Sequence, residues 1–407
     1  MTITDVTDLP RGTRLDRPSV AGVRTTIAPI LERLATTAGQ REEQRDYAFD
    51  DVRRLASAGV AVIEIPVADG GAGGSVRDTV EAVVAIARAD SSVAQALRPT
   101  FLAAHQIAEN PSAPFRAENI ERLLSGALFV GTGNERNGGA SGSVSTTATR
   151  VDGGYLVTGT KFYSTGGLYA DYFSTQAATD DGTIIRFTIP VAREGLHRID
   201  DFDAVGQRLT QSGSTRLDSV RVHDHEVFVA DDVSRDNPWT GSFAQLYLAA
   251  VQAGIAAAAL DDAIEFVRDR ARPIKHSTAA ASIDDPYVRE TVGEIAARAQ
   301  AAAAVVAAAA DAVHAVRGLT GAPARTAGAH AAVQVAGAGV IAIESALRSA
   351  ELLFDVGGGS ITDRALGFDR HWRNARTAAN HNPRQWKTAV AGAYHLTGEE
   401  PPTTGLF

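Results

Sequence analysis

Three long segments in the second half of the chain constrain the fold most, because they contain few residues that interrupt a helix. They are Phe243–Arg268, Tyr287–Arg317 and Ala329–Phe354, and all three are rich in alanine. Alanine has the highest helix propensity, and helices with small side chains can pack closely against each other. The run Ala301–Ala310 is too short and too weakly hydrophobic to span a bilayer. The pattern therefore predicts a helical bundle, which could also form the core of an oligomer.

The chain before this bundle changes its hydrophobic period twice. From about Val23 to Leu124 apolar residues recur at helical spacing, whereas from about Ala127 to Asp232 they alternate, as Ile185–Ile189 illustrates. Asp152–Gly154 is a turn signal between two alternating stretches. The order of these regions predicts an α+β chain. Its expected parts are an N-terminal helical domain at 20–126, a mostly antiparallel β domain at 127–232 and a C-terminal four-helix bundle at 233–407.

Charge and composition exclude several classes of function. The formal net charge is -9 and no basic stripe is present, so the chain lacks the electrostatic footprint of a nucleic-acid partner. Cysteine is absent, which excludes disulfides, thiolate metal sites and a cysteine nucleophile. The histidines are scattered, and the close pair His223 and His225 lies at an expected strand end, so we predict no metal site. We expect a cytoplasmic protein with no membrane partner.

A glycine-rich stretch in the expected β domain invites comparison with dinucleotide-binding loops. It runs from Gly131 to Gly139, but the glycine that follows Gly133 is Gly138, so the G-x-G-x-x-G spacing fails. No helix clearly follows it, as that motif requires. From the residues alone this stretch is a surface turn.

The segment Phe368–Pro383 predicts a helix that stops abruptly. The residue before a proline is disfavoured in helical geometry, so Asn382-Pro383 marks the stop. His381 lies at this stop, where a side chain can project into a cavity. Imidazole titrates near neutral pH and can move a proton in either direction, which makes His381 our candidate catalytic residue; the alternative is a capping or core histidine.

Four segments together resemble the acyl-CoA dehydrogenase superfamily over nearly the whole chain. They are a proline-then-glycine loop, a flavin-contacting strand, a later glycine motif and the flavin-site helix, namely Ile65–Ser75, Gly159–Thr165, Asp355–Gly359 and Phe368–Pro383. Within the superfamily the chain is most similar to the dibenzothiophene monooxygenase branch, to which indole monooxygenases are close. Lys161–Gly166 and His371–Pro383 carry this narrower resemblance.

The resemblance implies which residues contact a flavin. Asn134 would hydrogen-bond the rim of the isoalloxazine, and Tyr163, Ser164 and Thr165 would lie beside the ring. If the strand is regular, Ser164 and Thr165 point to opposite faces, so their side chains cannot both meet the ring. Arg270 would reach the flavin phosphates, often across a subunit interface; its alternative role is that of a solvated residue at a helix C-terminus.

The same resemblance gives His381 its role in flavin–oxygen chemistry and reveals two departures from the branch. A histidine expected one helical turn earlier is replaced by Ala378. A second, on the helix after Asp90-Ser91-Ser92, is replaced by Thr100, so Thr100 and Phe101 are expected to contact the substrate. His105 lies more than a turn further on and could substitute only in part.

These features imply a two-component flavin-dependent monooxygenase. A separate reductase would supply reduced FMN or FAD, since the chain has no nicotinamide-binding motif. O2 would form a C4a-hydroperoxyflavin in a closed apolar pocket, and a small apolar heteroaromatic compound of the thiophene or indole type would be oxygenated. The family also implies a homotetramer.

Two alternatives remain open at this point. An acyl-CoA dehydrogenase needs a carboxylate base, and the turn Asn380–Pro383 has none, so the base would have to be displaced, with Glu344 as the candidate. The ordinary reading of Glu344 is a solvated helix residue. The other alternative is a helical oligomer without enzymatic function, which would bind neither oxidised nor reduced flavin.

Overall fold

The computed structural model describes residues 16–135, 144–229, 237–405 and 407. Five helices form its first part, namely α1 (Val20–Gln44), α2 (Phe49–Ser57), α3 (Val76–Ala89), α4 (Ser91–Glu109) and α5 (Arg116–Leu124). Side-chain caps fix where several of them begin. Ser19 caps α1, Ser75 forms a capping box with Asp78 at the start of α3, and Asp90 accepts hydrogen bonds from two backbone N–H groups at the start of α4.

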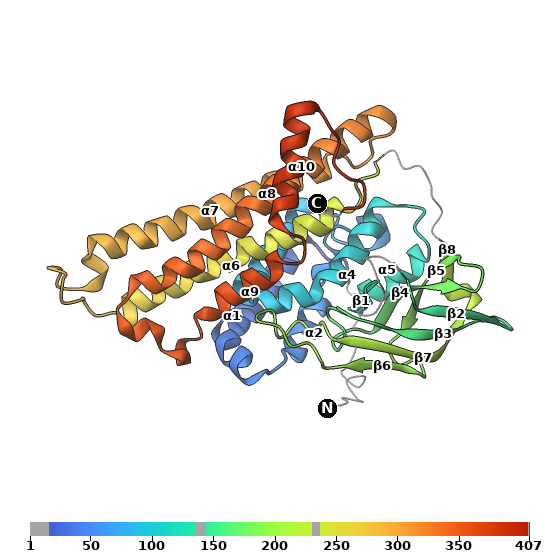
Figure 1. The fold of residues 1–407 in the computed structure, drawn as a ribbon, viewed down its shortest axis with the longest axis horizontal. Helices are drawn as coiled ribbons and strands as arrows, with labels where there is room; N and C mark the ends of the chain where they lie inside the picture. Colours follow the sequence, from blue (N-terminus) through green and yellow to red (C-terminus); the bar gives the residue numbers. More distant parts are fainter. Residues whose placement is uncertain (1–15, 136–143, 230–236, 406) are drawn as a thin grey trace.

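One curled sheet forms the middle of the chain (Figure 1). Its strands are β1 (Phe129–Gly131), β2 (Thr147–Val151), β3 (Gly154–Lys161), β4 (Tyr172–Thr179), β5 (Ile184–Pro190), β6 (Leu196–Ile199), β7 (Ser214–His223) and β8 (Val227–Val229). The order is β6-β7-β3-β2-β4-β5-β8, with β1 on β4. The predicted turn at Asp152–Gly154 is confirmed, since Val151 pairs with Gly154 in the β2–β3 hairpin. Most pairings are antiparallel, but β1 and β2 each pair with β4 in parallel.

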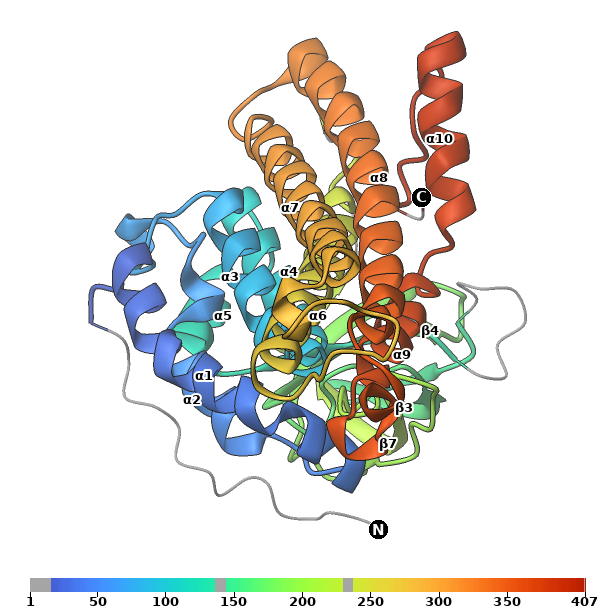
Figure 2. The same cartoon turned by 90° about the vertical axis from the view of Figure 1, so that its left-hand side faces the viewer.

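Long helices return after the sheet. They are α6 (Ser242–Asp269), α7 (Pro286–His314) and α8 (Gly321–Leu352), followed by the shorter α9 (Asp369–Ala379) and α10 (Arg384–Thr397). Figure 2 shows α6, α7 and α8 side by side, and both short helices pack against α8. In the described residues the expected four-helix bundle is therefore three long helices with two short ones.

The first helices and the bundle share one hydrophobic core. α3 packs against α6 and α7, and Gly254 on α6 makes this close approach possible. A Cβ at Gly254 would lie 2.4 Å from the Cβ of Ala87 and 2.7 Å from the carbonyl oxygen of Val84. The largest hydrophobic cluster combines residues of both parts, such as Val83 and Ala250, whereas the sheet has a separate cluster of its own.

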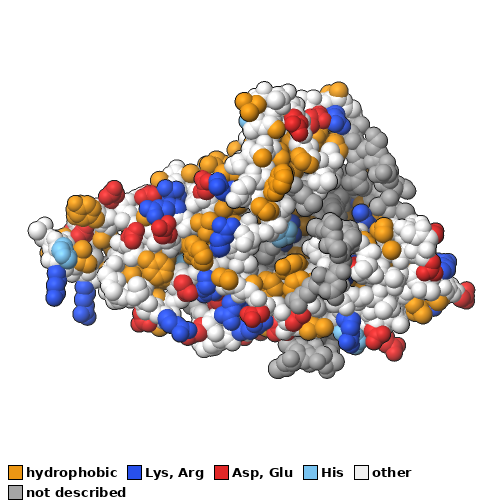
Figure 3. Space-filling model, viewed as in Figure 1, with side chains coloured by type: hydrophobic (Ala, Val, Ile, Leu, Met, Phe, Trp, Pro, Cys, Tyr) orange, Lys and Arg blue, Asp and Glu red, His pale blue; other side chains and the backbone are white. Residues whose placement is uncertain are grey.

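Helices α6, α7 and α8 are each long and apolar enough to cross a membrane by length and composition alone. Within the protein, however, 78% of the most apolar window of α6 and 61% of that of α8 are buried, against 28% for α7. Figure 3 shows acidic and basic side chains interspersed along one face of this bundle. The apolar residues of α6 and α8 thus mostly serve the interior of the fold.

Candidate active site

The site forms where a turn of the β domain lies against α4. This turn, Tyr163–Gly166, follows β3, and Gly166 adopts a φ of +81°. A Cβ at Gly166 would lie 2.4 Å from the carbonyl oxygen of Ala96 on α4. The backbone N–H of Gly166 also donates to the carbonyl oxygen of Thr210 at 2.8 Å. Both the positive φ and the close contact require glycine, so this residue fixes the turn on the helix.

The loop after β1 is tied to the same turn. The N–H of Phe162 donates to the carbonyl oxygen of Asn134 at 2.9 Å, and the hydroxyl of Thr132 donates to the carbonyl oxygen of Phe162 at 2.8 Å. Asn134 is exposed, so its side-chain amide is accessible to a ligand. The later glycines of this stretch, Gly138 and Gly139, lie outside the described residues.

A buried ion pair holds this loop from behind. The Nζ atom of Lys161 lies 2.5 Å from a carboxylate oxygen of Glu135, and the two side chains are 0% and 2% exposed. The backbone N–H and hydroxyl groups of Ser145 and Thr146 also donate to Glu135. Burial alone would raise the pKa of Glu135, but these hydrogen bonds lower it to about 2. Burial lowers the pKa of Lys161, against the effect of Glu135.

The alternation expected for Ser164 and Thr165 is wrong, because the strand is not regular there. β3 ends at Lys161, and Tyr163 has a φ of +59° with a side chain that is 54% exposed. Ser164 is 1% exposed and its hydroxyl accepts a hydrogen bond from Thr215 at 2.8 Å. The hydroxyl of Thr165 lies 2.9 Å from that of Ser212. In this turn it is therefore Tyr163 that is exposed, while Ser164 is buried.

His381 follows the end of α9, as the helix stop at Pro383 predicted. Its Nδ1 atom lies 2.6 Å from the Oδ1 atom of Asn382, and the residue is exposed. Desolvation by the surrounding protein and the nearby positive charge of Arg98 lower the pKa of His381 to about 4, although the Asn382 hydrogen bond opposes this. His381 is therefore neutral at pH 7.

Two cations beside His381 were not found from the sequence. Arg98, on α4, donates from Nη2 to the carbonyl oxygen of Ala244 at 3.3 Å, and burial lowers its pKa to about 10. Lys387, on α10, is 3% exposed and its Nζ atom donates to Oε1 of Gln245 at 2.8 Å. Burial lowers the pKa of Lys387 to about 8. The available signal for Arg98 was an arginine directly before a proline within an apolar helix.

Thr100 and Phe101, the expected substrate contacts, lie in the core. Thr100 is 1% exposed and its hydroxyl bonds to both the N–H and the carbonyl oxygen of Phe129, at 2.9 and 3.2 Å. Phe101 is 2% exposed and packs on Tyr247 with ring centroids 5.5 Å apart. The structure therefore shows both residues in packing contacts within the core, and their contact with a substrate stays a prediction.

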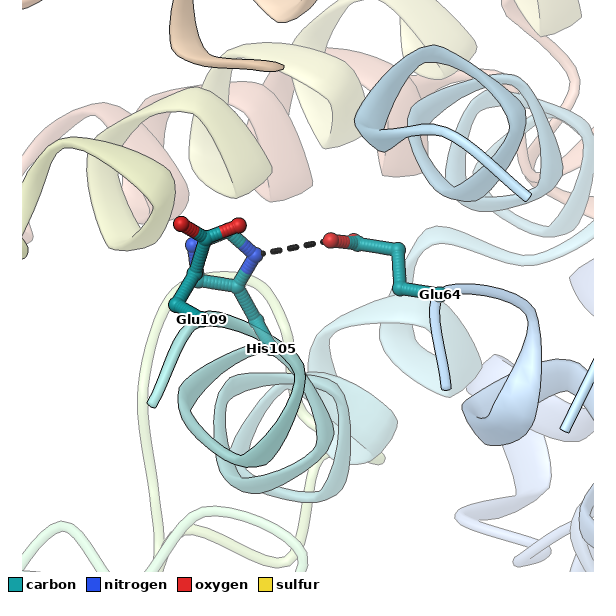
Figure 4. A group of neighbouring side chains, drawn as sticks. All are labelled: Glu64, His105 and Glu109. Atoms are coloured by element: carbon teal, nitrogen blue, oxygen red, sulfur yellow. Dashed lines mark hydrogen bonds and ion pairs between the residues drawn. The ribbon is translucent and has the colours of Figure 1, made fainter. Parts of the chain in front are cut away.

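His105 belongs to a separate ion-pair cluster, drawn in Figure 4. Its Nδ1 atom lies 2.9 Å from Glu64, and its ring stacks on Phe243 at a centroid distance of 3.9 Å. Glu64, His105 and Glu109 have the mutual spacing of metal ligands. However, the guanidinium of Arg317 lies 2.8 Å from Glu64 and 2.5 Å from Glu109 and already compensates both carboxylates. The cluster joins the first helices to the bundle, and His105 is not available as a substitute for the missing histidine.

Two other candidates lie on the bundle surface. Arg270 ends α6 and is exposed, and Ala244, the contact of Arg98, lies near the opposite end of this helix. At 1.5 Å per residue they are about 39 Å apart along the axis. Arg270 therefore cannot join the site of its own chain. Glu344 is 50% exposed and pairs with Arg384 at 2.5 Å, which favours its reading as a solvated helix residue.

Comparison with known proteins agrees with this geometry. Residues 23–127 match the family model of the acyl-CoA dehydrogenase N-terminal domain, and residues 246–386 match that of the C-terminal domain. Dibenzothiophene monooxygenases of Mycolicibacterium goodii and Rhodococcus qingshengii are 29% and 30% identical, over 98% and 91% of this chain and 99% and 92% of theirs.

The solved structure of TdsC from Paenibacillus sp. A11-2 with FMN and indole is similar as well. It is 26% identical, with a TM-score of 0.86 over 95% of this chain and 99% of that one. The chain has the order of N-terminal helices, central sheet and C-terminal bundle, and its likeness to these proteins extends over nearly its full length. The chain therefore belongs to the acyl-CoA dehydrogenase superfamily, in the branch of flavin-dependent monooxygenases that contains the dibenzothiophene monooxygenases.

Proposed function

We propose that this monooxygenase takes reduced FMN or FAD from a separate reductase and uses O2 to oxygenate a small, mostly apolar heteroaromatic compound of the thiophene or indole type. The observation that carries the proposal is the neutral imidazole of His381 at the end of α9, where a dehydrogenase would need a carboxylate. One oxygen atom enters the substrate, and the other leaves as water with the two electrons and two protons of the reduced flavin.

The exposed groups at the edge of the β domain suit one side of a flat ring system. Asn134 offers an amide for its polar rim, and the Tyr163 ring offers an aromatic face for stacking. The Glu135–Lys161 pair and Gly166 keep these groups in place without help from a ligand. A bound reduced flavin would supply the electrons and activate O2.

His381 manages a proton in this proposal. Its Nδ1–H donates to the side-chain amide oxygen Oδ1 of Asn382, so the lone pair is on Nε2. Neutral at physiological pH, Nε2 would accept one of the two protons that the reduced flavin brings and return it to the departing water. The nearby charge of Arg98 makes the imidazolium acidic, so the return is favourable.

A second copy of the chain completes the site. Because Arg270 lies about 39 Å along α6 from the end near Arg98, we propose that it binds the flavin phosphate of a neighbouring subunit within a homotetramer. We further propose that the protein acts in the cytoplasm, where flavin reductases provide reduced flavin.

The test is incorporation of labelled oxygen. The purified protein, a flavin reductase and NADH would be incubated with thiophene- and indole-type compounds under 18O2, with FMN and then FAD. We expect products that carry one 18O atom, and much less product from His381→Gln. An unlabelled product, or acyl-CoA oxidation with an artificial electron acceptor by the unmutated protein, would overturn the proposal.

A further inference from the structure

Arg98 is partly buried, and it differs from other buried or partly buried arginines in having no carboxylate partner among the described residues. Arg41 and Arg53, for example, each lie 2.5 Å from a carboxylate oxygen, of Asp90 and Asp171 respectively. Among the residues that the structure describes, no carboxylate lies within ion-pair distance of Arg98. The difference indicates that the described part of the chain supplies no anionic partner for Arg98.

Carbonyl groups do not replace the missing carboxylate. Arg198, which also lacks a direct ion pair among the described residues, donates to three carbonyl oxygens, those of residues 167, 168 and 170. Arg98 has one such bond, to Ala244 at 3.3 Å, and its Nε atom is buried with no hydrogen-bond partner. A guanidinium has five N–H donors, so most of the capacity of Arg98 is unused.

The groups around Arg98 add no negative charge. On the bundle side they are the neutral His381, the cation Lys387 and the hydroxyl of Tyr247, which donates to the carbonyl oxygen of Ala94 at 2.6 Å. A partly buried charge without compensation is destabilising, and the buried Nε atom of Arg98 adds an unsatisfied donor. Such a cost is offset when an anion binds.

We propose that Arg98 is a specificity residue that binds the acidic group of the substrate, a carboxylate, sulfinate or sulfonate carried by the small apolar molecule. The planar guanidinium matches the two oxygens of such a group, which would accept two parallel hydrogen bonds. Arg98 lies on α4 two residues after Ala96, which Gly166 contacts, and its charge is close enough to act on His381. The inference rests on the proposed function and narrows its substrate class to organic acids.

Binding of a matched pair of compounds tests this without turnover. Indole and indole-2-carboxylate would be titrated into the protein loaded with oxidised FMN, by calorimetry. We expect the carboxylate to bind at least tenfold more tightly than indole. Arg98→Met should remove this preference and leave the Kd of indole within about twofold, and Arg98→Lys should retain part of it. Arg88→Met, which removes an exposed ion pair with Asp261, is the control and should change neither Kd.

The competing assignment is that Arg98 compensates the flavin. In that case Arg98→Met would weaken FMN binding and the carboxylate would show no advantage in the unmutated protein, and either result would overturn the proposal. Arg98→Met should not lower the melting temperature, because it removes a partly buried charge that has no carboxylate partner among the described residues. Since these titrations need no catalysis, absence of 18O in any product would count against the monooxygenase proposal and leave the binding result standing.

Discussion

Replacement of Lys161 by methionine tests whether the buried ion pair between Lys161 and Glu135, in the loop after β1, contributes the stability that its burial suggests. The substitution keeps most of the side-chain volume but leaves the carboxylate of Glu135, which is 2% exposed, without its cation. Removal of one partner of a buried pair costs about 3–5 kcal/mol. The donors of Ser145 and Thr146 remain, so we expect a loss near the lower value, about 3 kcal/mol.

The loss should depend on pH in a defined direction. The pKa of Glu135 is about 2 in the folded protein and about 4.3 in an unfolded chain. A lowered pKa means that this group stabilises the fold fully above about pH 4.3, and that the contribution disappears as the pH falls through 2. In Lys161→Met the pKa of Glu135 rises, so the carboxylate becomes neutral sooner. The deficit of the variant should therefore shrink between pH 7 and pH 4.

Urea unfolding followed by circular dichroism measures both effects. Arg150→Met is a matched control, because Arg150 and its partner Asp224 are 56% and 51% exposed, and such a pair contributes less than about 1 kcal/mol. The double variant Glu135→Gln with Lys161→Met should recover part of the loss, since no charge stays buried. If Lys161→Met loses no more stability than Arg150→Met, the reasoning from burial is refuted.

Three further predictions concern catalysis, the turn and the ion-pair cluster. His381→Gln should lower kcat by about 10²–10⁴-fold with an unchanged Kd for FMN. Because the pKa of His381 is about 4, kcat/KM of the unmutated enzyme should stay level down to about pH 5, and a midpoint near 6.5 in this pH profile would contradict the assignment. Gly166→Ala should unfold at lower urea concentration than Gly182→Ala, since both have positive φ but only Gly166 meets Ala96; equal midpoints would refute the contact. Arg317→Met should cost up to about 3 kcal/mol in urea unfolding, because it leaves the buried Glu64 with His105 as its remaining partner, and an unchanged midpoint would disprove the role of the cluster.

The helices could be predicted closely from the sequence because their signals are local. The expected Phe243–Arg268 is Ser242–Asp269 in the structure, since an alanine-rich stretch with a single glycine and no proline leaves mainly the ends to decide. The helix stop before Pro383 and the hairpin at Asp152–Gly154 depend equally on neighbouring residues. The two parallel pairings of the sheet escaped prediction, because alternation shows which face of a strand is buried and not which strand lies beside it.

The site was harder to predict because its properties depend on distant residues. The alternation of Ser164 and Thr165 failed because Tyr163, which is not a glycine, adopts a positive φ that nothing in the sequence marks. Arg98 was missed because the absence of an ion-pair partner is a property of the folded molecule. The cluster around Arg317 was not predictable for the same reason, since its partner Glu64 lies 253 residues earlier in the chain.

The core shared by the first helices and the bundle has a consequence for synthesis on the ribosome. The apolar face of α3, which includes Val83 and Ala87, is covered by α6 around Gly254. The helix that covers it emerges roughly 150 residues later, with the whole sheet translated in between. At about 5–20 residues per second, that face waits roughly 8–30 seconds for its partner. The nascent chain therefore exposes an apolar surface throughout translation of the sheet. The yield of folded protein in a cell should then depend on chaperones that bind this surface before α6 appears.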